Sequence, residues 1–350
     1  MKVGIIGFSG CGKTTLFNAL TGLKAETGMG KKSGQNLGQI KVPDTRVDTL
    51  AEIYSPKKTT YAEIVFVDFL GGAAGEAGKG MESSTIGQIR QVDALAIVVR
   101  GFDNPMLTAD KDPNSELENF LTELVLADLV VVERRLERIA KEGGKAKAEQ
   151  QLLEKLQATL EEEKPLRSLG LRNDELALLS GFQFLTLKPG IVVVNHSEDE
   201  IGETAWPGID DTAATFDMKT VRLSAQTEME INDLDEEERS MFLEELGITE
   251  SAKDKLVVAT FGVLDLISFL TAGPDECRAW PVRREAPAVE AAGKIHSDIA
   301  RGFIRAEVIH WTDFEQHRSE TACKNAGVAH LEGKEYAVQD GDVINFRFNV

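Results

Sequence analysis

The segment that most constrains this chain is residues 7–14, which read Gly-Phe-Ser-Gly-Cys-Gly-Lys-Thr and match the pattern GxxxxGK[ST]. Glycines at these positions let successive backbone N–H groups converge on phosphate oxygens, and a following helix directs its positive end at the same place. The apolar run before the motif, residues 2–6, predicts a buried parallel strand. The apolar spacing over 15–23 predicts a helix after it. Strand, glycine loop and helix in this order predict a phosphate-binding loop in an α/β domain.

Individual residues of this loop have expected roles. Lys13 is the candidate catalytic residue, because its ammonium group would neutralise the β- and γ-phosphates of a nucleotide. The hydroxyl of Thr14 is a candidate ligand of Mg²⁺, the cofactor that such loops use. The candidate nucleotide-binding residues of the loop are Ser9, Gly10, Cys11, Gly12, Lys13, Thr14 and Thr15.

A second candidate element follows the next apolar strand, which is predicted over 64–67. Residues 68–71 read Asp-Phe-Leu-Gly, a DxxG pattern. A carboxylate at the end of a strand beside a phosphate-binding loop suits Mg²⁺ coordination, and the glycine N–H can contact a γ-phosphate. We therefore expect Asp68 at the metal and Gly71 at the nucleotide.

Two polar segments after later strands are candidates for base recognition. Residues 195–198 read Asn-His-Ser-Glu and occupy the place of NKxD in the Ras-like GTPases, with Glu198 instead of the aspartate that reads guanine. The extra methylene moves the carboxylate outward, whereas an Asn side chain can serve adenine as donor and acceptor. Asn195 and Glu198 are therefore expected to favour ATP, with GTP as the alternative. Ser224 and Ala225 are expected to flank the base.

The rest of the chain shows apolar patterns of ordinary helices and strands. Residues 116–164 predict two antiparallel helices with a glycine tip at Gly143-Gly144, either a solvated hairpin or a partner-docking arm. The other expected elements are strands over 94–99, 191–194, 221–223 and 343–348, helices over 44–53, 237–246 and 251–270, and glycine-rich loops over 25–38 and 71–80.

Composition excludes several classes of protein. A formal charge of −19 over 350 residues argues against DNA or membrane binding by the chain as a whole. No apolar run approaches the ~18 residues of a transmembrane helix, and the N-terminus does not resemble a signal peptide. Three cysteines do not form a disulfide framework, so we expect the cytoplasm. Residues 281–350 are nearly neutral, and Lys294, Arg301, Arg305 and Trp311 are candidate RNA contacts there.

Several longer segments resemble the Obg-like ATPase (YchF) family over essentially the whole chain, in order: GFSGCGKTTLFNALTG, FVDFLGG, VVRGFDN, NHSE and KEYAVQDGDVINFRFNV. The resemblance implies a Ras-like P-loop NTPase domain, an inserted antiparallel helical hairpin and a C-terminal TGS domain of the β-grasp type. It also implies ATP preference and association with the ribosome or RNA through the TGS domain and the helical arm. The domains implied are 1–113 with 185–272 for nucleotide binding, 114–184 for the hairpin and 273–350 for the TGS domain.

The sequence departs from the family pattern around the γ-phosphate. Gly10 stands where the family has an asparagine, and Gly72 replaces a hydrophobic residue after DxxG. The switch I threonine has no clear counterpart, although Thr27 or Ser33 lies nearby. These changes predict a nucleotide switch that binds ATP and hydrolyses it slowly. The alternatives are a true GTPase and a non-hydrolysing, nucleotide-gated binding module.

Overall fold

The computed structural model of the chain describes residues 1–25, 34–70, 83–107, 110–142, 147–200, 206–245 and 251–349. They form two compact units. The first comprises Met1–Gln39 and Val65–Leu256, and the second comprises Ile40–Ile64 and Val257–Val350. The sequence-based division assigned residues 40–64 to the nucleotide-binding domain, whereas their contacts group them with the C-terminal residues. The three functional domains stay a prediction.

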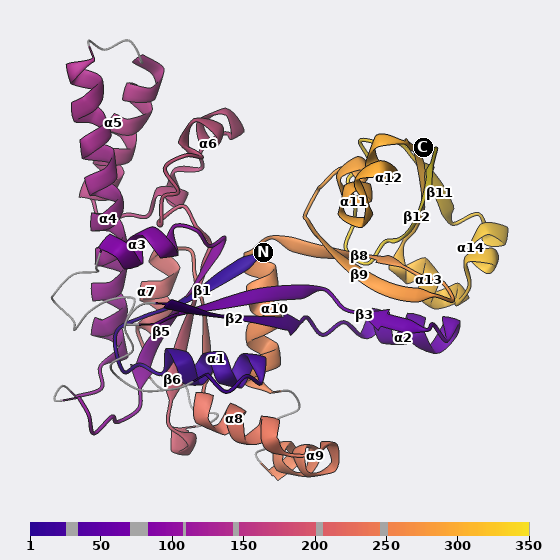
Figure 1. The fold of residues 1–350 in the computed structure, drawn as a ribbon, viewed down its shortest axis with the longest axis horizontal. Coiled ribbons are helices and arrows are strands. Elements are labelled where there is room, and N and C mark those ends of the chain that lie inside the picture. The colour runs from indigo at the N-terminus through magenta and orange to yellow at the C-terminus, as the bar shows by residue number, and fades with distance from the viewer. Residues whose placement is uncertain are drawn as a thin grey trace. The chain divides into compact units, whose positions relative to one another are not determined.

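The first unit is built on a sheet with strand order β2-β4-β1-β5-β6-β7. β4, β1, β5, β6 and β7 pair in parallel in that order. β5 and β6 are buried along their whole length, as expected for parallel strands covered on both faces. The strands are β1 Lys2–Ile6, β2 Gly34–Lys41, β4 Glu63–Leu70, β5 Ala94–Gly101, β6 Gly190–His196 and β7 Lys219–Leu223 (Figure 1).

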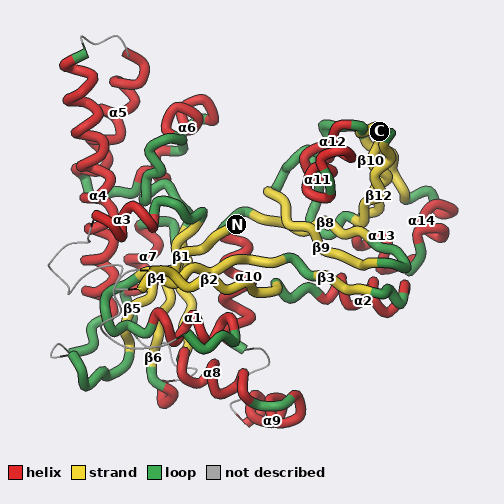
Figure 2. The backbone as a smooth tube through the Cα atoms, in the orientation of Figure 1, coloured by secondary structure: helices red, strands yellow, loops and turns green. Residues whose placement is uncertain are grey.

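Helices cover this sheet (Figure 2). α1 packs against α8, while α4 packs against β5 and α7. Helix α1 ends at Thr21 rather than at the expected residue 23, because Gly22 adopts a left-handed conformation with φ of 68° and caps the helix. The helices are α1 Lys13–Thr21, α3 Ser83–Ile89, α4 Pro113–Lys141, α5 Lys147–Glu161, α6 Asn173–Leu179, α7 Ile209–Thr215, α8 Ala225–Asp233 and α9 Glu236–Glu245, with 3₁₀ turns η1 Leu166–Leu169 and η2 Glu198–Glu200.

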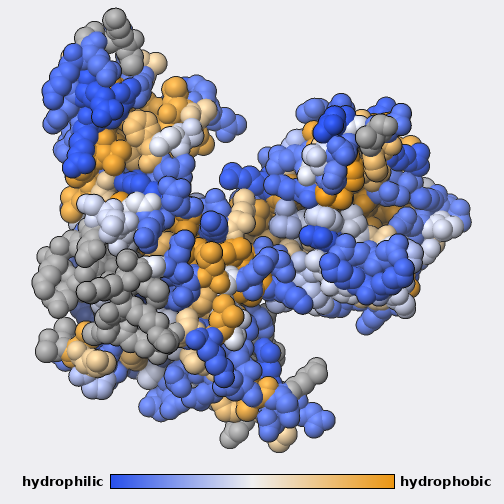
Figure 3. Space-filling model, viewed as in Figure 1, coloured by the Kyte–Doolittle hydropathy of each residue, from blue (hydrophilic) through white to orange (hydrophobic). Residues whose placement is uncertain are grey.

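The expected helical hairpin is formed by α4 and α5, which lie side by side (Figure 1). Its inner seam is apolar, and the visible outer surface is largely hydrophilic (Figure 3). Arg135 on α4 joins the helices through an ion pair of 2.7 Å with Glu149 on α5. The glycine tip lies outside the described residues. The seam residues include Leu124, Val132, Ile139, Leu153, Leu156 and Leu160.

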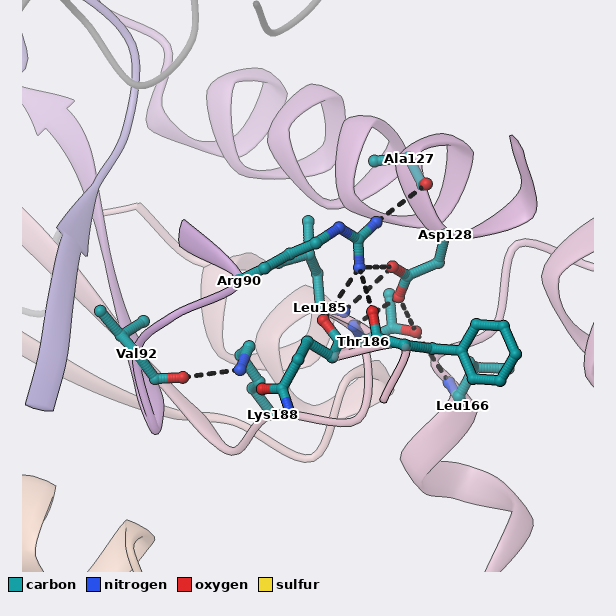
Figure 4. A network of polar contacts seen from close by, with 10 residues as sticks. Arg90, Val92, Ala127, Asp128, Leu166, Leu185, Thr186 and Lys188 are labelled. Atoms are coloured by element: carbon teal, nitrogen blue, oxygen red, sulfur yellow. Dashed lines mark hydrogen bonds and ion pairs between the residues drawn. The ribbon is translucent and has the colours of Figure 1, made fainter. Parts of the chain in front are cut away.

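A buried polar network fastens the base of the hairpin to the sheet (Figure 4). Asp128 on α4 is fully buried and accepts hydrogen bonds from the N–H groups of Leu185 (3.0 Å) and Thr186 (2.8 Å). It also accepts from the Thr186 hydroxyl at 2.9 Å and forms an ion pair of 2.9 Å with Arg90, which follows α3. The network therefore connects α3, the hairpin and the segment that leads into β6.

The second unit contains a sheet with strand order β11-β10-β12-β8-β9-β3 (Figure 2). Its core contains Phe269, Phe346 and the alanines of α11. The strands are β3 Lys58–Thr60, β8 Leu266–Thr271, β9 Glu276–Arg283, β10 Phe303–Ile309, β11 Ala329–Glu332 and β12 Val343–Phe348. The helices are α2 Thr45–Tyr54, α10 Ala252–Val263, which begins in the first unit, α11 Ala288–Ile295, α12 Ser297–Arg301, α13 Trp311–His317 and α14 Glu320–Ala326.

Residues 40–64 join this unit through side chains and a strand. Arg46 forms an ion pair of 3.0 Å with Asp340, and the ring of Tyr54 stacks on Phe314 at 6.4 Å. β3 pairs in parallel with β9. The segment that follows β2 is therefore part of the second unit.

Two expectations about secondary structure were wrong. The helix predicted over 251–270 ends at Val263, and 266–271 forms β8 because this apolar run pairs with β9 and β12. The loop predicted over 25–38 contains the start of β2 at Gly34. Its residues 26–33 lie outside the described residues, as does the whole of the expected loop 71–80.

Candidate phosphate-binding site

The glycine loop lies between β1 and α1, as the sequence predicted. Gly7 has φ of 150°, and a Cβ there would lie 2.3 Å from the carbonyl oxygen of Val98. Gly12 has φ of 92°, and a Cβ there would lie 2.2 Å from Nδ2 of Asn195. Both positions therefore require glycine for conformation and for space. Gly12 is also the N-cap of α1, so no side chain caps the first N–H groups of this helix, which would face an anion.

Lys13 is held across the loop that it follows. Its Nζ donates to the carbonyl oxygens of Gly7 (3.0 Å) and Phe8 (2.7 Å). The side chain is buried, with 7% exposed. An ammonium group has three N–H donors, and the third is directed at the weak acceptor Cys11 Sγ at 4.0 Å, which an oxygen of a ligand on the loop can replace. Positive charge is therefore fixed where the loop N–H groups converge.

Thr14 and Asp68 meet next to the loop. The Thr14 hydroxyl donates to Oδ2 of Asp68 at 2.9 Å, and Nδ2 of Asn36 on β2 donates to the same oxygen at 3.2 Å. Asp68 is fully buried, and its Oδ1 has no hydrogen-bond partner among the described residues. A buried carboxylate oxygen without a partner is costly unless a ligand satisfies it. The hydroxyl and the carboxylate are both hard oxygen donors, which fits Mg²⁺.

Asn195 at the end of β6 connects the loop with the start of α8. Its Nδ2 donates to the carbonyl oxygen of Cys11 at 3.0 Å, and its Oδ1 accepts from the N–H of Ala225 at 3.0 Å. The side chain is buried, with 4% exposed. Most of the hydrogen-bonding capacity expected to read a base is therefore used to position the loop. One N–H of the amide remains without a protein acceptor in these bonds.

The other candidate base residues differ in their surroundings. Ser224 is the N-cap of α8 and accepts from the N–H of Thr227 at 3.3 Å, so its side chain stabilises the helix. Glu198 begins η2 and is exposed. Gly71 lies outside the described residues, as do Gly72 and the switch I candidates Thr27 and Ser33.

Sequence reasoning missed two asparagines of this site. Asn36 was placed in a loop, yet it lies on β2 and contacts Asp68. Asn104 donates from Nδ2 to the carbonyl oxygen of Gly10 at 3.2 Å. It follows β5, the strand beside β1, and a polar residue after the neighbouring strand was a signal that could have identified it.

Cys11 is an inert member of the loop. It is 1% exposed, and burial raises the pKa of its thiol above the ordinary value, against the opposing charge of Lys13. A thiol with a raised pKa forms little of the reactive thiolate at neutral pH. Cys11 therefore contributes its backbone to the loop rather than redox chemistry.

A parallel sheet, a glycine loop that opens a helix, a buried lysine and a Thr–Asp pair define a P-loop nucleotide-binding protein. Comparisons with known proteins identify the family more narrowly. Residues 2–135 match the family model described as a 50S ribosome-binding GTPase. Residues 266–349 match the model of the YchF GTPase C-terminal region, described as a protein of unknown function (DUF933).

The chain belongs to the YchF family. It is 40% identical to the ribosome-binding ATPase YchF of Bacillus subtilis (strain 168) over 100% of both chains. The same identity relates it to the ribosome-binding ATPase YchF of Escherichia coli O157:H7, over 100% of this chain and 99% of the relative.

Solved structures agree with this assignment. The Schizosaccharomyces pombe YchF GTPase superimposes with a TM-score of 0.87 at 29% identity, over 99% of this chain and 97% of that one. A GTP-binding protein of Pyrococcus horikoshii OT3 shares the fold, with a TM-score of 0.59 at 17% identity over 100% of both chains. No helix in the described ranges has the length and apolar character needed to span a membrane.

Proposed function

We propose that this chain is a Mg²⁺-dependent ATPase that hydrolyses ATP slowly and acts as a nucleotide switch. The observation that carries the proposal is the Thr14–Asp68 pair beside the phosphate-binding loop, with one buried carboxylate oxygen that lacks a partner among the described residues. Thr14 and Asp68 would hold Mg²⁺, which would supply charge neutralisation at the β- and γ-phosphate oxygens.

The chain's own groups would bind and polarise the triphosphate. The loop N–H groups and the positive end of α1 would receive the phosphates, and Lys13 would neutralise charge that develops on the leaving oxygens. Water would attack the γ-phosphate. Position 72 is glycine rather than a water-orienting glutamine. Intrinsic turnover is therefore expected to be slow, and groups supplied by a partner accelerate related enzymes by about 10³–10⁵.

ATP is the favoured nucleotide because Glu198 stands where an aspartate would read guanine. The relatives named ribosome-binding ATPase support this choice. GTP hydrolysis is the second candidate, favoured by the S. pombe relative, which is titled a GTPase. Substituting Glu198→Asp tests the assignment, because the shorter carboxylate should move the selectivity towards GTP. Unchanged selectivity would remove Glu198 from base recognition.

The experiment that tests hydrolysis measures phosphate release from ATP with and without ribosomes, for the wild type and for Lys13→Ala. The proposal predicts slow turnover by the wild type, acceleration by ribosomes and loss of both in the variant. Turnover that stays at the buffer level even with ribosomes would favour the non-hydrolysing, nucleotide-gated binding module instead.

The proposed partner is the ribosome, on the strength of the relatives' names. Contact with RNA would involve the second unit, where the exposed side chains of Arg305 and Arg347 occupy directly paired positions on β10 and β12. Arg347 forms an ion pair of 3.4 Å with Glu307, so the paired arginines carry more positive charge than this carboxylate neutralises, which suits contact with a phosphate. Trp311, another candidate RNA contact, stacks on Phe314 at 5.9 Å.

The proposed location of the protein is the cytoplasm. Two variants test its contact with the ribosome. Arg305→Glu and Arg347→Glu should each lower co-sedimentation with ribosomes while leaving ATP affinity unchanged. Co-sedimentation equal to that of the wild type would leave the helical arm, α4 and α5, as the proposed contact.

A further inference from the structure

The corner of the first unit formed by α8 and α9 carries an apolar hollow that nucleotide chemistry does not use. The hollow has a volume of about 520 Å³. Met241 on α9 is 71% exposed, and Phe242 beside it is half-buried. Large apolar side chains gathered at an exposed hollow are typical of protein-interaction surfaces. The lining residues are Leu234, Glu238, Met241, Phe242 and Glu244.

The surroundings of this hollow are strongly acidic. Residues 233–245 contain seven acidic residues and one basic residue, Arg239. Arg239 forms an ion pair of 3.5 Å with Asp254. Asp233, Glu237, Glu238 and Glu244 are exposed. Figure 3 shows a few hydrophobic side chains among hydrophilic surface at this corner. Such a surface repels phosphate groups and attracts cationic side chains.

The helices that form the hollow are stabilised by hydrogen bonds at the end of α8 and at the start of α9. The N–H of Glu238 donates to Asp235 at 2.9 Å, and the N–H of Asp235 donates to Glu238 at 3.3 Å, which is a reciprocal cap of α9. Lys253 on α10 donates to Asn232 at 2.9 Å, which fixes the end of α8. A preorganised surface loses less conformational entropy when it binds.

We propose that the α8–α9 corner docks a lysine- or arginine-rich protein segment that inserts an apolar side chain into the hollow lined by Leu234, Met241 and Phe242. The half-buried side chain of Phe242 lines the hollow, and the flexible thioether of Met241 would adapt to the inserted side chain. The acidic rim selects cationic residues on either side and excludes RNA. This inference does not depend on ATP hydrolysis.

A synthetic probe tests the proposal on the full chain. The probe is a short fluorescein-labelled peptide of lysine and alanine with two leucines one helical turn apart, and its binding is followed by fluorescence anisotropy at low and physiological salt. The wild type should bind it, more weakly as salt rises. Met241→Ser should lower affinity about tenfold, as should Glu237→Lys combined with Glu244→Lys. The same peptide with serine in place of leucine should bind less well.

A matched control distinguishes peptide binding at this corner from attraction of the peptide by the negative charge of the whole chain. Glu133→Lys combined with Glu137→Lys makes the same charge change on exposed residues of α4 and should leave peptide affinity unchanged. ATP affinity, measured on each variant, verifies that the first unit is folded. Equal affinity of wild type and Met241→Ser would overturn the proposal, as would equal weakening by the control pair. Tighter binding of an RNA oligonucleotide than of the peptide, lost on the same corner substitutions, would also overturn it.

Discussion

Gly12 and Asn195 are in direct contact, although 182 residues lie between them in the sequence. Nδ2 of Asn195 occupies the space that a Cβ of Gly12 would fill, and it donates to the neighbouring Cys11 carbonyl. Its Oδ1 accepts from Ala225. The amide of Asn195 thus fixes the phosphate-binding loop to the end of β6 and to the start of α8.

Gly12→Ala should abolish tight nucleotide binding. The new methyl group would collide with Asn195 at 2.2 Å, and φ of 92° is unfavourable for alanine. We expect affinity to fall by at least about tenfold, measured by isothermal titration calorimetry. Gly22→Ala is the matched control, because Gly22 also has positive φ, yet a methyl group there would meet nothing within 4 Å among the described residues. Equal loss in both variants would show that general destabilisation is responsible.

Asn195→Ala should weaken ATP and GTP binding to a similar degree. The side chain positions the loop through Cys11 and Ala225, and loop geometry serves both nucleotides alike. Equilibrium binding of both nucleotides to the variant measures the effect. A selective loss of ATP affinity would return Asn195 to the adenine-reading role that the sequence suggested.

Asp128→Ala should destabilise the first unit. The substitution removes the acceptor of Leu185 and Thr186 and leaves the Arg90 guanidinium without its carboxylate. Breaking a buried ion pair costs about 3–5 kcal/mol, which urea unfolding would detect. Glu118→Ala, on an exposed face of α4, should change stability by no more than about 0.5 kcal/mol. A cost for Asp128→Ala no larger than for this control would contradict the structural role.

Glu228 should make stability depend on pH. It is 4% exposed, and burial raises the pKa of its carboxyl above the ordinary 4.5, opposed by the Ala252 N–H that donates to it. The folded state therefore holds the proton more tightly. This contribution to stability is fully present at pH values below the pKa that the Glu228 carboxyl has in the unfolded chain. It is lost as pH rises through the pKa that the same carboxyl has in the folded chain.

Glu228→Gln lacks this ionisation, so its melting temperature should rise relative to the wild type as pH increases from the ordinary carboxyl pKa of 4.5 to neutral pH. Thermal unfolding of both proteins across this range measures the difference. Glu230→Gln changes an exposed position two residues along α8. Its melting temperature should differ from that of the wild type by the same amount at every pH. A constant offset for Glu228→Gln as well would mean that its carboxyl titrates normally in the folded chain.

Short sequence patterns predicted those helices and strands that neighbouring residues specify by themselves. The strands at 2–6 and 343–348 and the two hairpin helices are found where the sequence placed them, because apolar periodicity and glycine boundaries specify them directly. The helix predicted over 251–270 failed because a continuous apolar run fits a buried strand as well as a helix.

Other features depend on contacts between distant residues. Pairing of Arg46 with Asp340 and stacking of Tyr54 on Phe314 bring residues 40–64 into the second unit, and no local pattern encodes either contact. The glycine motif located Lys13 and Thr14, while the role of Asn36 depends on β2 lying next to β4 and that of Asn104 on β5 lying next to β1.

The most direct test of the account is equilibrium binding of ATP and GTP, with Mg²⁺, to the purified nucleotide-free chain and to Lys13→Ala. The account predicts that the wild type binds ATP more tightly than GTP and that the variant loses affinity for both by at least about tenfold. Tighter binding of GTP, or an affinity for ATP that Lys13→Ala leaves unchanged, would contradict it.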